Sequence, residues 1–368
     1  MSSDNSFKSE VLTFLRDIPS NITGTVRMVF SPMFFREHKV QIIIFLMLCL
    51  YPIIPGLTGL DYLIHIAVIA NIFAMIALAW DLNGGYTGQG NLAAGFFAGI
   101  CGYTSAILST QAGWPILPSL LLGIFFSFIS AVGIGFPSLR MKGPYLVIVT
   151  FAVAEVARKL TIYFSDVTQG EEGIGGVPRI FVGAFANFYW TLFVLVIVFL
   201  IARKIIQSKW GLAFKAIAKD ETRARTLGVN VTNYKILSFS LCGIFAGLAG
   251  GLFAHYQAHI DPHFFSIILA ISVISMAVIG GEKTLIGPII GAYLLQFLTE
   301  GLRFVTGGAP WARQGIHGLL LVVVMLFLPG GILSLIRGTE EGVEESGVNK
   351  FRRKVRSIFF IEEEEEEE

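Results

Sequence analysis

The sequence predicts an all-α, polytopic membrane protein with about ten transmembrane helices and with both termini in the cytoplasm. Only 14% of its 368 residues are charged and 54% are hydrophobic, whereas a soluble domain carries about 25% charged residues. Apolar segments of about 20 residues, the length that crosses a bilayer, recur along most of the chain. Glycine occurs 40 times, which is typical of membrane helices that pack closely.

Ten apolar segments are predicted to cross the membrane, and together they form a transmembrane domain over residues 40–336. They are 40–57, 62–82, 91–110, 114–136, 145–163, 189–207, 235–256, 265–281, 285–305 and 315–336. Two of these segments, 91–110 and 285–305, are rich in glycine. Each is therefore predicted either to cross fully or to be broken or re-entrant.

The positive charges support this number of spans and their orientation. With ten spans and a cytoplasmic N-terminus, 22 of the 27 Lys and Arg residues fall at the cytoplasmic side. The other five are Arg158, Lys159, Arg179, Arg303 and Arg313. This excess fits the positive-inside rule, and one span more or fewer would scramble it.

Two terminal segments flank the spans, and both are predicted to be cytoplasmic. Residues 1–39 show no cleavable signal pattern; they form either a helix lying on the membrane surface or a partly disordered tail. The apolar face of that helix would carry Phe7, Val11, Phe14, Leu15 and Ile18. Residues 337–368 end in seven glutamates, Glu362–Glu368, a run that stays largely disordered and to which we assign no function.

Two connections between spans are long. The external one, 164–188, is rich in glycine and acidic at Glu171 and Glu172; it either contacts an extracytoplasmic partner or is a plain solvated loop. The cytoplasmic one, 208–234, contains the basic stretch KWGLAFKAIAKDETRARTLGVNV at 209–231.

The stretch 209–231 is predicted to form two short helices with a turn at Asp220. Asp220 fits the N-cap of the second helix, with Glu221 in its first turn, and Gly228 fits its C′ position. Thr232 then caps the next span. Residues at helical spacing make an apolar stripe: Leu212, Ala213, Ala216, Ile217 and Ala224. Lys215 and Lys219 lie on another face.

Helices this short are not stable alone, so they must dock on something. The alternatives are the protein's own cytoplasmic surface, the lipid headgroups, or the groove of a partner protein. The chain has no G-x-x-x-x-G-K-[ST] phosphate loop, so no ATP hydrolysis is expected in it. No enzymatic activity and no metal site are predicted either, because the histidines form no recognisable set and Pro262 interrupts the spacing of His255, His259 and His263.

Polar residues inside the apolar segments or directly beside them are candidates for a solute pathway, because such residues are costly in a membrane. The candidates are Gln89, Asn91, Thr150, Glu155, Ser272 and Gln296. Hydrogen bonding between helices is the alternative role for each of them. For Glu155 the alternative is a local salt bridge, because Arg158 and Lys159 follow at i+3 and i+4.

Five segments, in the right order, resemble the permease subunits of branched-chain amino acid ABC importers, specifically the LivM type. They are GGYTGQGNLAAGFFAGICGYTSAIL, SLRMKGPYLVIVTFAVAEV, TQGEEGIGGVP, GLAFKAIAKDETRARTLGVNVTNYKILSFSLCGIFAGLAGGLF and HGLLLVVVMLFLPGGI. The resemblance covers about residues 60–336. Two departures leave the exact substrate open: Leu92–Ala94 stand where the family often has a histidine, and Glu282 and Lys283 stand in a turn that is usually richer in glycine.

The resemblance implies a non-catalytic subunit of an importer in the prokaryotic inner membrane, for branched-chain or other apolar amino acids. The implied partners are a homologous second permease of the LivH type, two ATPase subunits and an extracytoplasmic substrate-binding protein. ATP and Mg would bind the ATPase subunits, and no cofactor is implied in this chain. It also implies internal inverted halves, although the sequence itself shows only a weak likeness between 84–103 and 280–293.

The resemblance further implies that 209–231 is the coupling helix, which transmits closure of the ATPases to the spans. The residues assigned to this coupling are Phe214, Ala216, Ile217, Asp220, Glu221, Arg223, Arg225 and Gly228.

Three alternatives remain at this stage. Within the same class, the substrate is urea, a short amide or a sugar. A self-contained secondary transporter would need ion-coupling carboxylates at mid-membrane, where Glu155 stands nearly alone, and would leave the stretch 209–231 unexplained. A membrane-embedded enzyme would need facing clusters of His, Asp or Cys, which the sequence does not display.

Overall fold

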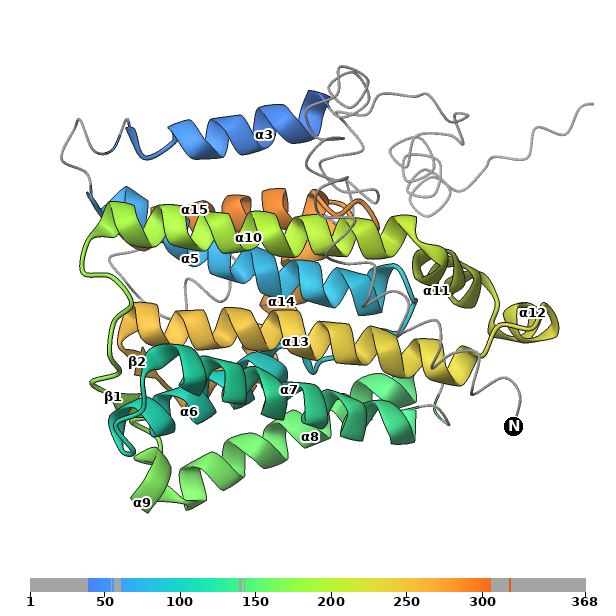
Figure 1. Ribbon diagram of the computed structural model, residues 1–368, viewed down its shortest axis with the longest axis horizontal. Helices are drawn as coiled ribbons and strands as arrows, with labels where there is room; N and C mark the ends of the chain where they lie inside the picture. Colours follow the sequence, from blue (N-terminus) through green and yellow to red (C-terminus); the bar gives the residue numbers. More distant parts are fainter. Residues whose placement is uncertain are drawn as a thin grey trace, which may run out of the picture.

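The computed structural model describes residues 39–53, 55, 61–138, 141, 143–305 and 318, and in these residues the chain is a helical bundle (Figure 1). The helices are α3 (Lys39–Leu50), α5 (Asp61–Trp80), α6 (Ala94–Thr110), α7 (Ile116–Ser138), α8 (Pro144–Tyr163), α9 (Ser165–Thr168), α10 (Ala184–Gln207), α11 (Lys209–Lys219), α12 (Glu221–Thr226), α13 (Val231–Gln257), α14 (Ile267–Gly280) and α15 (Gly287–Val305). A π-helix, η1 (Asp81–Gly85), continues α5, and a 3₁₀-helix, η2 (Pro262–Phe265), precedes α14. The short strands β1 (Ile174–Gly175) and β2 (His259–Ile260) pair antiparallel.

Within the described residues, each of the first nine predicted spans coincides with a helix. Four of these helices are long and apolar enough to cross a membrane: α5 with η1, α7, α10 and α13; α6 and α14 are apolar but shorter. Neither α6 nor α15 is broken at its glycines, so the alternative of a broken helix is wrong for both. The tenth predicted span, the N-terminal segment through residue 38 and the tail from 337 lie outside the described residues.

Helix α13 lies at the centre of the bundle, where it packs against α5, α6 and α7 (Figure 1). Small residues permit this close approach. A Cβ on Gly250 would lie 2.1 Å from the carbonyl oxygen of Ala98 in α6. The hydroxyl of Ser127 in α7 donates to the carbonyls of Gly243 in α13, at 2.7 Å, and of Phe97 in α6, at 3.1 Å. These contacts join the three helices.

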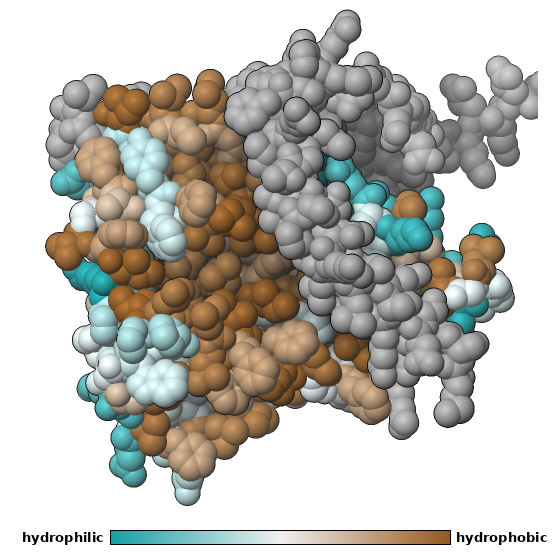
Figure 2. All heavy atoms as spheres, in the orientation of Figure 1, coloured by the Kyte–Doolittle hydropathy of each residue, from teal (hydrophilic) through white to brown (hydrophobic). Residues whose placement is uncertain are grey.

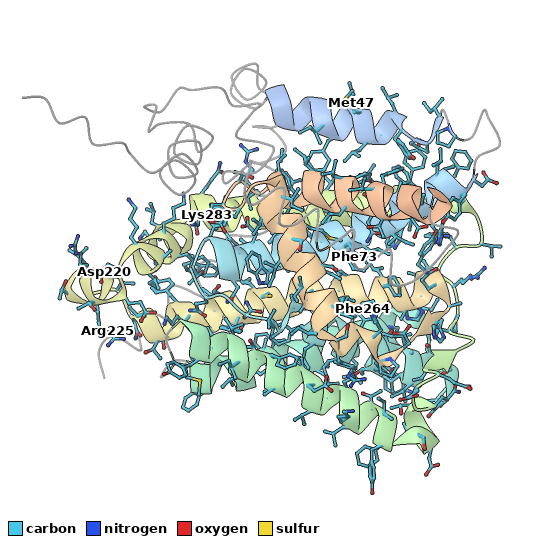
Figure 3. All side chains as sticks on the ribbon, turned by 180° about the vertical axis from the view of Figure 1, so that it is seen from behind. Met47, Phe73, Asp220, Arg225, Phe264 and Lys283 are labelled. Carbon is cyan, nitrogen blue, oxygen red and sulfur yellow. The ribbon has the colours of Figure 1, made fainter. Side chains whose placement is uncertain are left out.

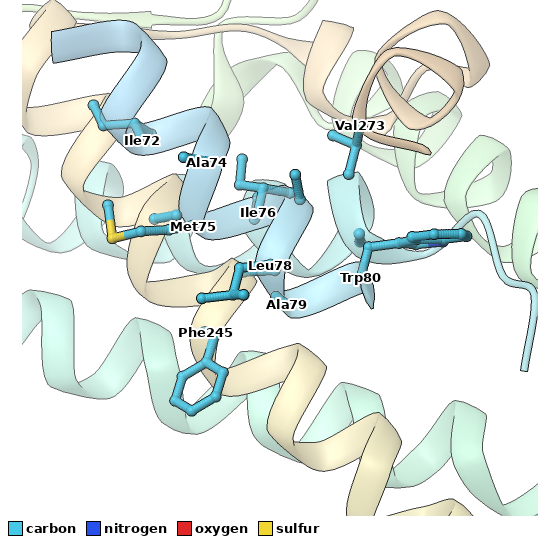
Figure 4. Close-up of a cluster of buried hydrophobic side chains, with 14 of the residues drawn as sticks. Ile72, Ala74, Met75, Ile76, Leu78, Ala79, Trp80, Phe245 and Val273 are labelled. Carbon is cyan, nitrogen blue, oxygen red and sulfur yellow. The ribbon is translucent and has the colours of Figure 1, made fainter. Parts of the chain in front are cut away.

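Helix α5 forms the centre of the hydrophobic core. Apart from Asp61, His65 and Asn71, its side chains are apolar or aromatic on every face, and a helix with that pattern belongs in an interior. Ile72, Met75 and Leu78 are fully buried, and Figure 4 shows them near Phe245 of α13 and Val273 of α14. The core thus extends from α5 to helices on either side of it.

The outer surface of the bundle is apolar. Figure 2 shows hydrophobic side chains across the middle of the visible face, with hydrophilic ones gathered toward the two ends. Helices α7 and α8 expose large apolar side chains, among them Leu117, Leu121, Phe125, Ile148 and Val156. Soluble monomers rarely expose continuous apolar patches of this kind, so the surface suits a lipid environment.

The two ends of the bundle carry different elements (Figure 1). We call the end with α11 and α12 the α12 end, and the end with α9, β1 and β2 the β end. At the α12 end, the backbone N–H of Lys283 donates to the carboxylate of Asp81 at 2.9 Å. The turn between α14 and α15 therefore meets η1. The two segments that show the weak internal likeness, 84–103 and 280–293, both start at the α12 end. Inverted copies would start at opposite ends, so this likeness does not relate inverted copies.

Part of the predicted external loop 164–188 is held against the end of α13. Ile174 of β1 pairs with Ile260 of β2. Gly173 has φ +72°, and a Cβ there would lie 2.2 Å from the Ile260 carbonyl oxygen, so the close approach requires glycine. This part of the loop is therefore packed against the chain itself.

Candidate functional site

Two consecutive short helices, α11 and α12, form the α12 end as predicted. The side chain of Asp220 accepts the backbone N–H groups of Thr222, at 2.8 Å, and Arg223, at 3.1 Å. This confirms Asp220 as the predicted N-cap. The cap predicted for the next span is wrong: α13 begins one residue before Thr232, and its N-cap is Asn230, whose side chain accepts the N–H of Asn233, the third residue of the helix.

Helix α12 ends in a Schellman motif at the predicted glycine. Gly228 has φ +85°, and its N–H donates to the Arg225 carbonyl at 3.1 Å. The next N–H, of Val229, donates to the Ala224 carbonyl at 3.1 Å. This pair of bonds satisfies carbonyls that a helix end otherwise leaves without partners, so the short helix has a defined stop.

The buried face of α11 differs from the predicted apolar stripe. Four buried side chains of α11 follow the helical spacing i, i+3, i+4 and i+7. They are Trp210, Ala213, Phe214 and Ile217. Phe214 is fully buried and meets Tyr234 of α13 edge-on, with the ring centroids 6.3 Å apart. Leu212, which belongs to the predicted stripe, is 66% exposed, because the aromatic residues take the inward positions.

The exposed residues of α11, of α12 and of the turn after α12 combine apolar and basic side chains. Leu212 and Leu227 are exposed large apolar residues. The exposed basic residues around them are Lys215, Lys219, Arg223 and Arg225. We call these six residues the α11–α12 face. Of the residues assigned to coupling, the structure therefore exposes Arg223, Arg225 and Gly228, and it buries Phe214 and Ile217. Ala216, Asp220 and Glu221 are half-buried.

One ion pair ties α12 to α13. The ammonium group of Lys235 binds the carboxylate of Glu221, and the Lys235 side chain is only 5% exposed. A lysine in the first turns of an apolar span is costly unless it is paired. Sequence reasoning missed Lys235. Its place in the first turns of an apolar span was the signal that it has an acidic partner.

The turn after η1 contacts α11. Gly88 has φ +71°, and a Cβ there would lie 3.2 Å from the Cα of Ala218. Beside this contact lies a cavity of about 300 Å³, lined by Thr87 and by residues 217–222. The glycine-rich turn GGYTGQG is therefore the surface against which α11 is seated.

Three of the six pathway candidates belong to this α12 end. The amides of Asn91 and Asn83 contact each other at 2.6 Å, and the hydroxyl of Thr150 accepts the N–H of Leu92 at 3.0 Å. Gln89 is buried in the same turn. These contacts support the alternative role, hydrogen bonding between segments, for Asn91 and Thr150.

Glu155 lies on α8 and pairs within its own helix. Its carboxylate accepts from Arg158 Nε at 2.9 Å and from a terminal guanidinium nitrogen at 2.6 Å. Both side chains are about one-third exposed. The local salt bridge, which was the alternative reading for Glu155, is therefore formed.

The two remaining candidates meet in a cavity beside the β end. The cavity has a volume of about 450 Å³ and lies between α5, α13, α14 and α15. Ser272 of α14 and Gln296 of α15 line it. Its aromatic wall holds Phe73, Phe253 and Phe264, of which Figure 3 labels the first and the last. The Phe253 ring meets Phe73 and Phe264 edge-on, at centroid distances of 6.3 and 4.7 Å.

Acidic groups also line this cavity, which we call the β-end cavity. Asp261 and Glu300 contribute carboxylates, and the Tyr62 hydroxyl donates to Glu300 at 2.5 Å. Sequence reasoning missed all three: Tyr62 and Asp261 lie at the boundaries of apolar segments, where a polar residue needs no special explanation, and Glu300 lies inside the predicted span 285–305 but was not singled out. The cavity is within the size range of small-molecule sites.

Residues 62–325 match the family model described as branched-chain amino acid transport system / permease component. The chain is 27% identical over 303 residues to the high-affinity branched-chain amino acid transport system permease protein LivM of Salmonella typhimurium, covering 74% of this chain and 70% of that protein. It is 25% identical to a probable branched-chain amino acid transport permease protein LivH of Methanocaldococcus jannaschii, covering 72% and 89%. It is also 27% identical to the autoinducer 2 import system permease protein LsrC of Photorhabdus laumondii, covering 64% and 72%. No solved structure matches the chain significantly.

Proposed function

Because this chain belongs to the family of branched-chain amino acid transport permeases, we propose that it is the LivM-type membrane subunit of an ATP-driven importer of these amino acids. The α11–α12 face is the observation that carries the mechanism. It is exposed, mixed in apolar and basic character, and fastened to the longest helix of the described bundle through Glu221 and Lys235. A surface of this composition suits a protein partner, because apolar contacts and arginine are both enriched at interfaces.

The proposed orientation has the α12 end in the cytoplasm and the β end outside, with ten spans and with both termini cytoplasmic. The basic residues of the α11–α12 face support this orientation through the positive-inside rule. The proposed complex contains a homologous second permease, two ATPase subunits that bind ATP and Mg, and an extracytoplasmic binding protein. It lies in the inner membrane of a prokaryote.

The residues of the α12 end divide into two roles in this proposal. Arg223, Arg225 and the exposed leucines contact the ATPase subunits. Phe214 and Ile217 seat α11 on the chain's own core, so a push on the exposed face moves the helices below it. In this proposal the two helices dock both on the protein's own surface and on a partner protein, which are two of the alternatives that the sequence left open.

Reversing two charges tests the coupling role. With Arg223→Glu and Arg225→Glu together, we expect ATP-driven leucine uptake by the reconstituted complex to fall about tenfold or more, within the usual range of coupling energies. ATP hydrolysis should persist without transport, because neither residue belongs to the core. Hydrolysis and uptake are measured in the same proteoliposomes.

The matched control is Lys159→Glu, an exposed lysine of α8, which should leave both activities unchanged. Normal uptake by the double variant would contradict the assignment of the α11–α12 face to coupling.

A second candidate substrate is a sugar-like solute, which the relatives named for autoinducer 2 import favour. The branched-chain assignment is preferred because the family model that matches residues 62–325 is the one described for branched-chain amino acid transport. Uptake of labelled leucine in competition with unlabelled ribose separates the two: leucine uptake that ribose does not reduce supports the amino acid.

A further inference from the structure

The β-end cavity divides into an apolar part and an acidic part. Phe73, Phe253 and Phe264 supply an aromatic wall, whereas Asp261 and Glu300 supply carboxylates. The described residues that line it include no lysine and no arginine. A solute that fits both parts carries an apolar body and a cationic group.

We propose that the β-end cavity binds the transported amino acid within this subunit, and that Glu300 accepts its α-ammonium group. This inference rests on the proposed function. It locates a substrate site in the outer half of this chain, lined by α5, α13, α14 and α15.

The two carboxylates are not equivalent. One oxygen of Asp261 accepts the N–H of His263 at 2.8 Å, as the N-cap of η2. The other lies 4.0 Å from the His259 ring nitrogen. Asp261 therefore already serves the local backbone. Glu300 lies on the last turns of α15 and accepts from the Tyr62 hydroxyl, which positions a carboxylate able to accept several hydrogen bonds.

A charge-assisted hydrogen bond is the strong kind of polar contact, and the partly dry surroundings of the cavity strengthen it. Tyr62 thus acts as a positioning residue, because it orients the carboxylate without contacting the amino acid itself in this proposal.

The rest of the solute matches the rest of the lining. A leucine or isoleucine side chain would lie against the three phenylalanine rings, which form a continuous apolar surface. The side-chain amides of Gln257 and Gln296 line the cavity and provide N–H donors for the α-carboxylate. The Ser272 hydroxyl donates to the Ile268 carbonyl at 2.9 Å, so it is committed to its own helix.

Cysteine protection measures binding in the cavity directly. Ser272→Cys is introduced with Cys49→Ser, because Cys49 is the exposed cysteine and Cys101 and Cys242 are buried. The full complex in detergent is then labelled with an impermeant methanethiosulfonate reagent at increasing leucine concentrations. We expect leucine to slow labelling at position 272. The control is Ile267→Cys, an exposed position at the start of the same helix, where leucine should have no effect.

Charge removal tests Glu300. With Glu300→Gln, the leucine concentration that gives half-protection should rise about tenfold or more, as expected when a hydrogen bond loses its charge. Tyr62→Phe should shift it in the same direction by less. Glu172→Gln, an exposed acidic residue at the same end, should not shift it. The carboxylic acid 4-methylpentanoate, which matches leucine without its ammonium group, should protect poorly in the unmodified cavity.

The outcomes separate this inference from the proposed function. If the wild-type complex drives no ATP-dependent leucine uptake, the proposed function fails. If uptake is normal but leucine leaves labelling at 272 unchanged, the cavity assignment alone is wrong. If leucine protects equally with and without the Glu300 carboxylate, the role of Glu300 is wrong. Recovery of each variant as an intact complex is checked by gel filtration.

Discussion

Alanine at Gly250 should lower the yield of folded protein from membranes several-fold and reduce its melting temperature. The added Cβ would lie 2.1 Å from the carbonyl oxygen of Ala98 and 2.5 Å from its carbonyl carbon. These are backbone atoms, so no side-chain rotation relieves the clash, and α6 must move away from α13. Overpacking of this kind costs about 1–3 kcal/mol, and at a backbone crossing we expect the upper part of that range. Thermal unfolding of the purified protein, followed by loss of monodispersity, is the measurement.

The chain offers a matched control in Gly133 of α7. A Cβ at Gly133 meets nothing within 4 Å, and alanine is the better helix former by about 1 kcal/mol. Gly133→Ala should therefore leave the melting temperature unchanged or raise it. If Gly250→Ala melted with the wild type, the close crossing of α6 and α13 would not be a constraint on the fold.

Methionine at Lys235 should separate ATP hydrolysis from transport. The substitution keeps a long apolar chain but leaves the Glu221 carboxylate without its partner in a mostly buried position. Breaking a buried pair on one side costs about 3–5 kcal/mol, and the 25% exposure of the Glu221 side chain lowers our expectation to about 2 kcal/mol. We expect α12 to loosen from α13, uptake to fall about tenfold or more, and hydrolysis by the complex to continue.

Two further variants check the cause of that loss. The exchange Glu221→Lys with Lys235→Glu should restore part of the uptake, although a lysine in the first turn of α12 opposes the helix dipole. Lys159→Met, which removes an exposed lysine of α8, should have no effect. Parallel loss of hydrolysis and uptake in Lys235→Met would instead indicate a failure to assemble.

The features that follow from local chemistry were predicted from the sequence. Apolar runs of membrane length identify the helices of the bundle, because a backbone in lipid must satisfy its hydrogen bonds internally. Asp220 and Gly228 mark the ends of α12, because a cap depends on neighbours only a few residues away. The π-helical continuation of α5 at Asp81–Gly85 was not predicted, and neither was the contact of Asp81 with the distant Lys283.

The inward face of α11 shows where local reasoning stops. Two stripes at spacings of three and four can be drawn on this helix, one through Leu212 and one through Phe214. The two stripes share Ala213 and Ile217, and their centres differ by a rotation of about 80°. The packing of Phe214 against Tyr234 of α13 favours the second. The β-end cavity could not be predicted for the same reason. Ser272 and Gln296 were identified as polar residues in apolar segments, but their position beside Phe73 and Glu300 depends on the packing of four helices.

Helix α13 connects the α12 end with the β-end cavity, since it starts beside α12 and its last residue, Gln257, lines the cavity. Its 27 residues span about 40 Å without interruption. Such an element behaves as a stiff lever: a tilt of about 5° about one end displaces the other by about 3.5 Å, more than half the width of an aromatic ring. A small rocking movement imposed at the α12 end would thereby change the width of the cavity at the β end.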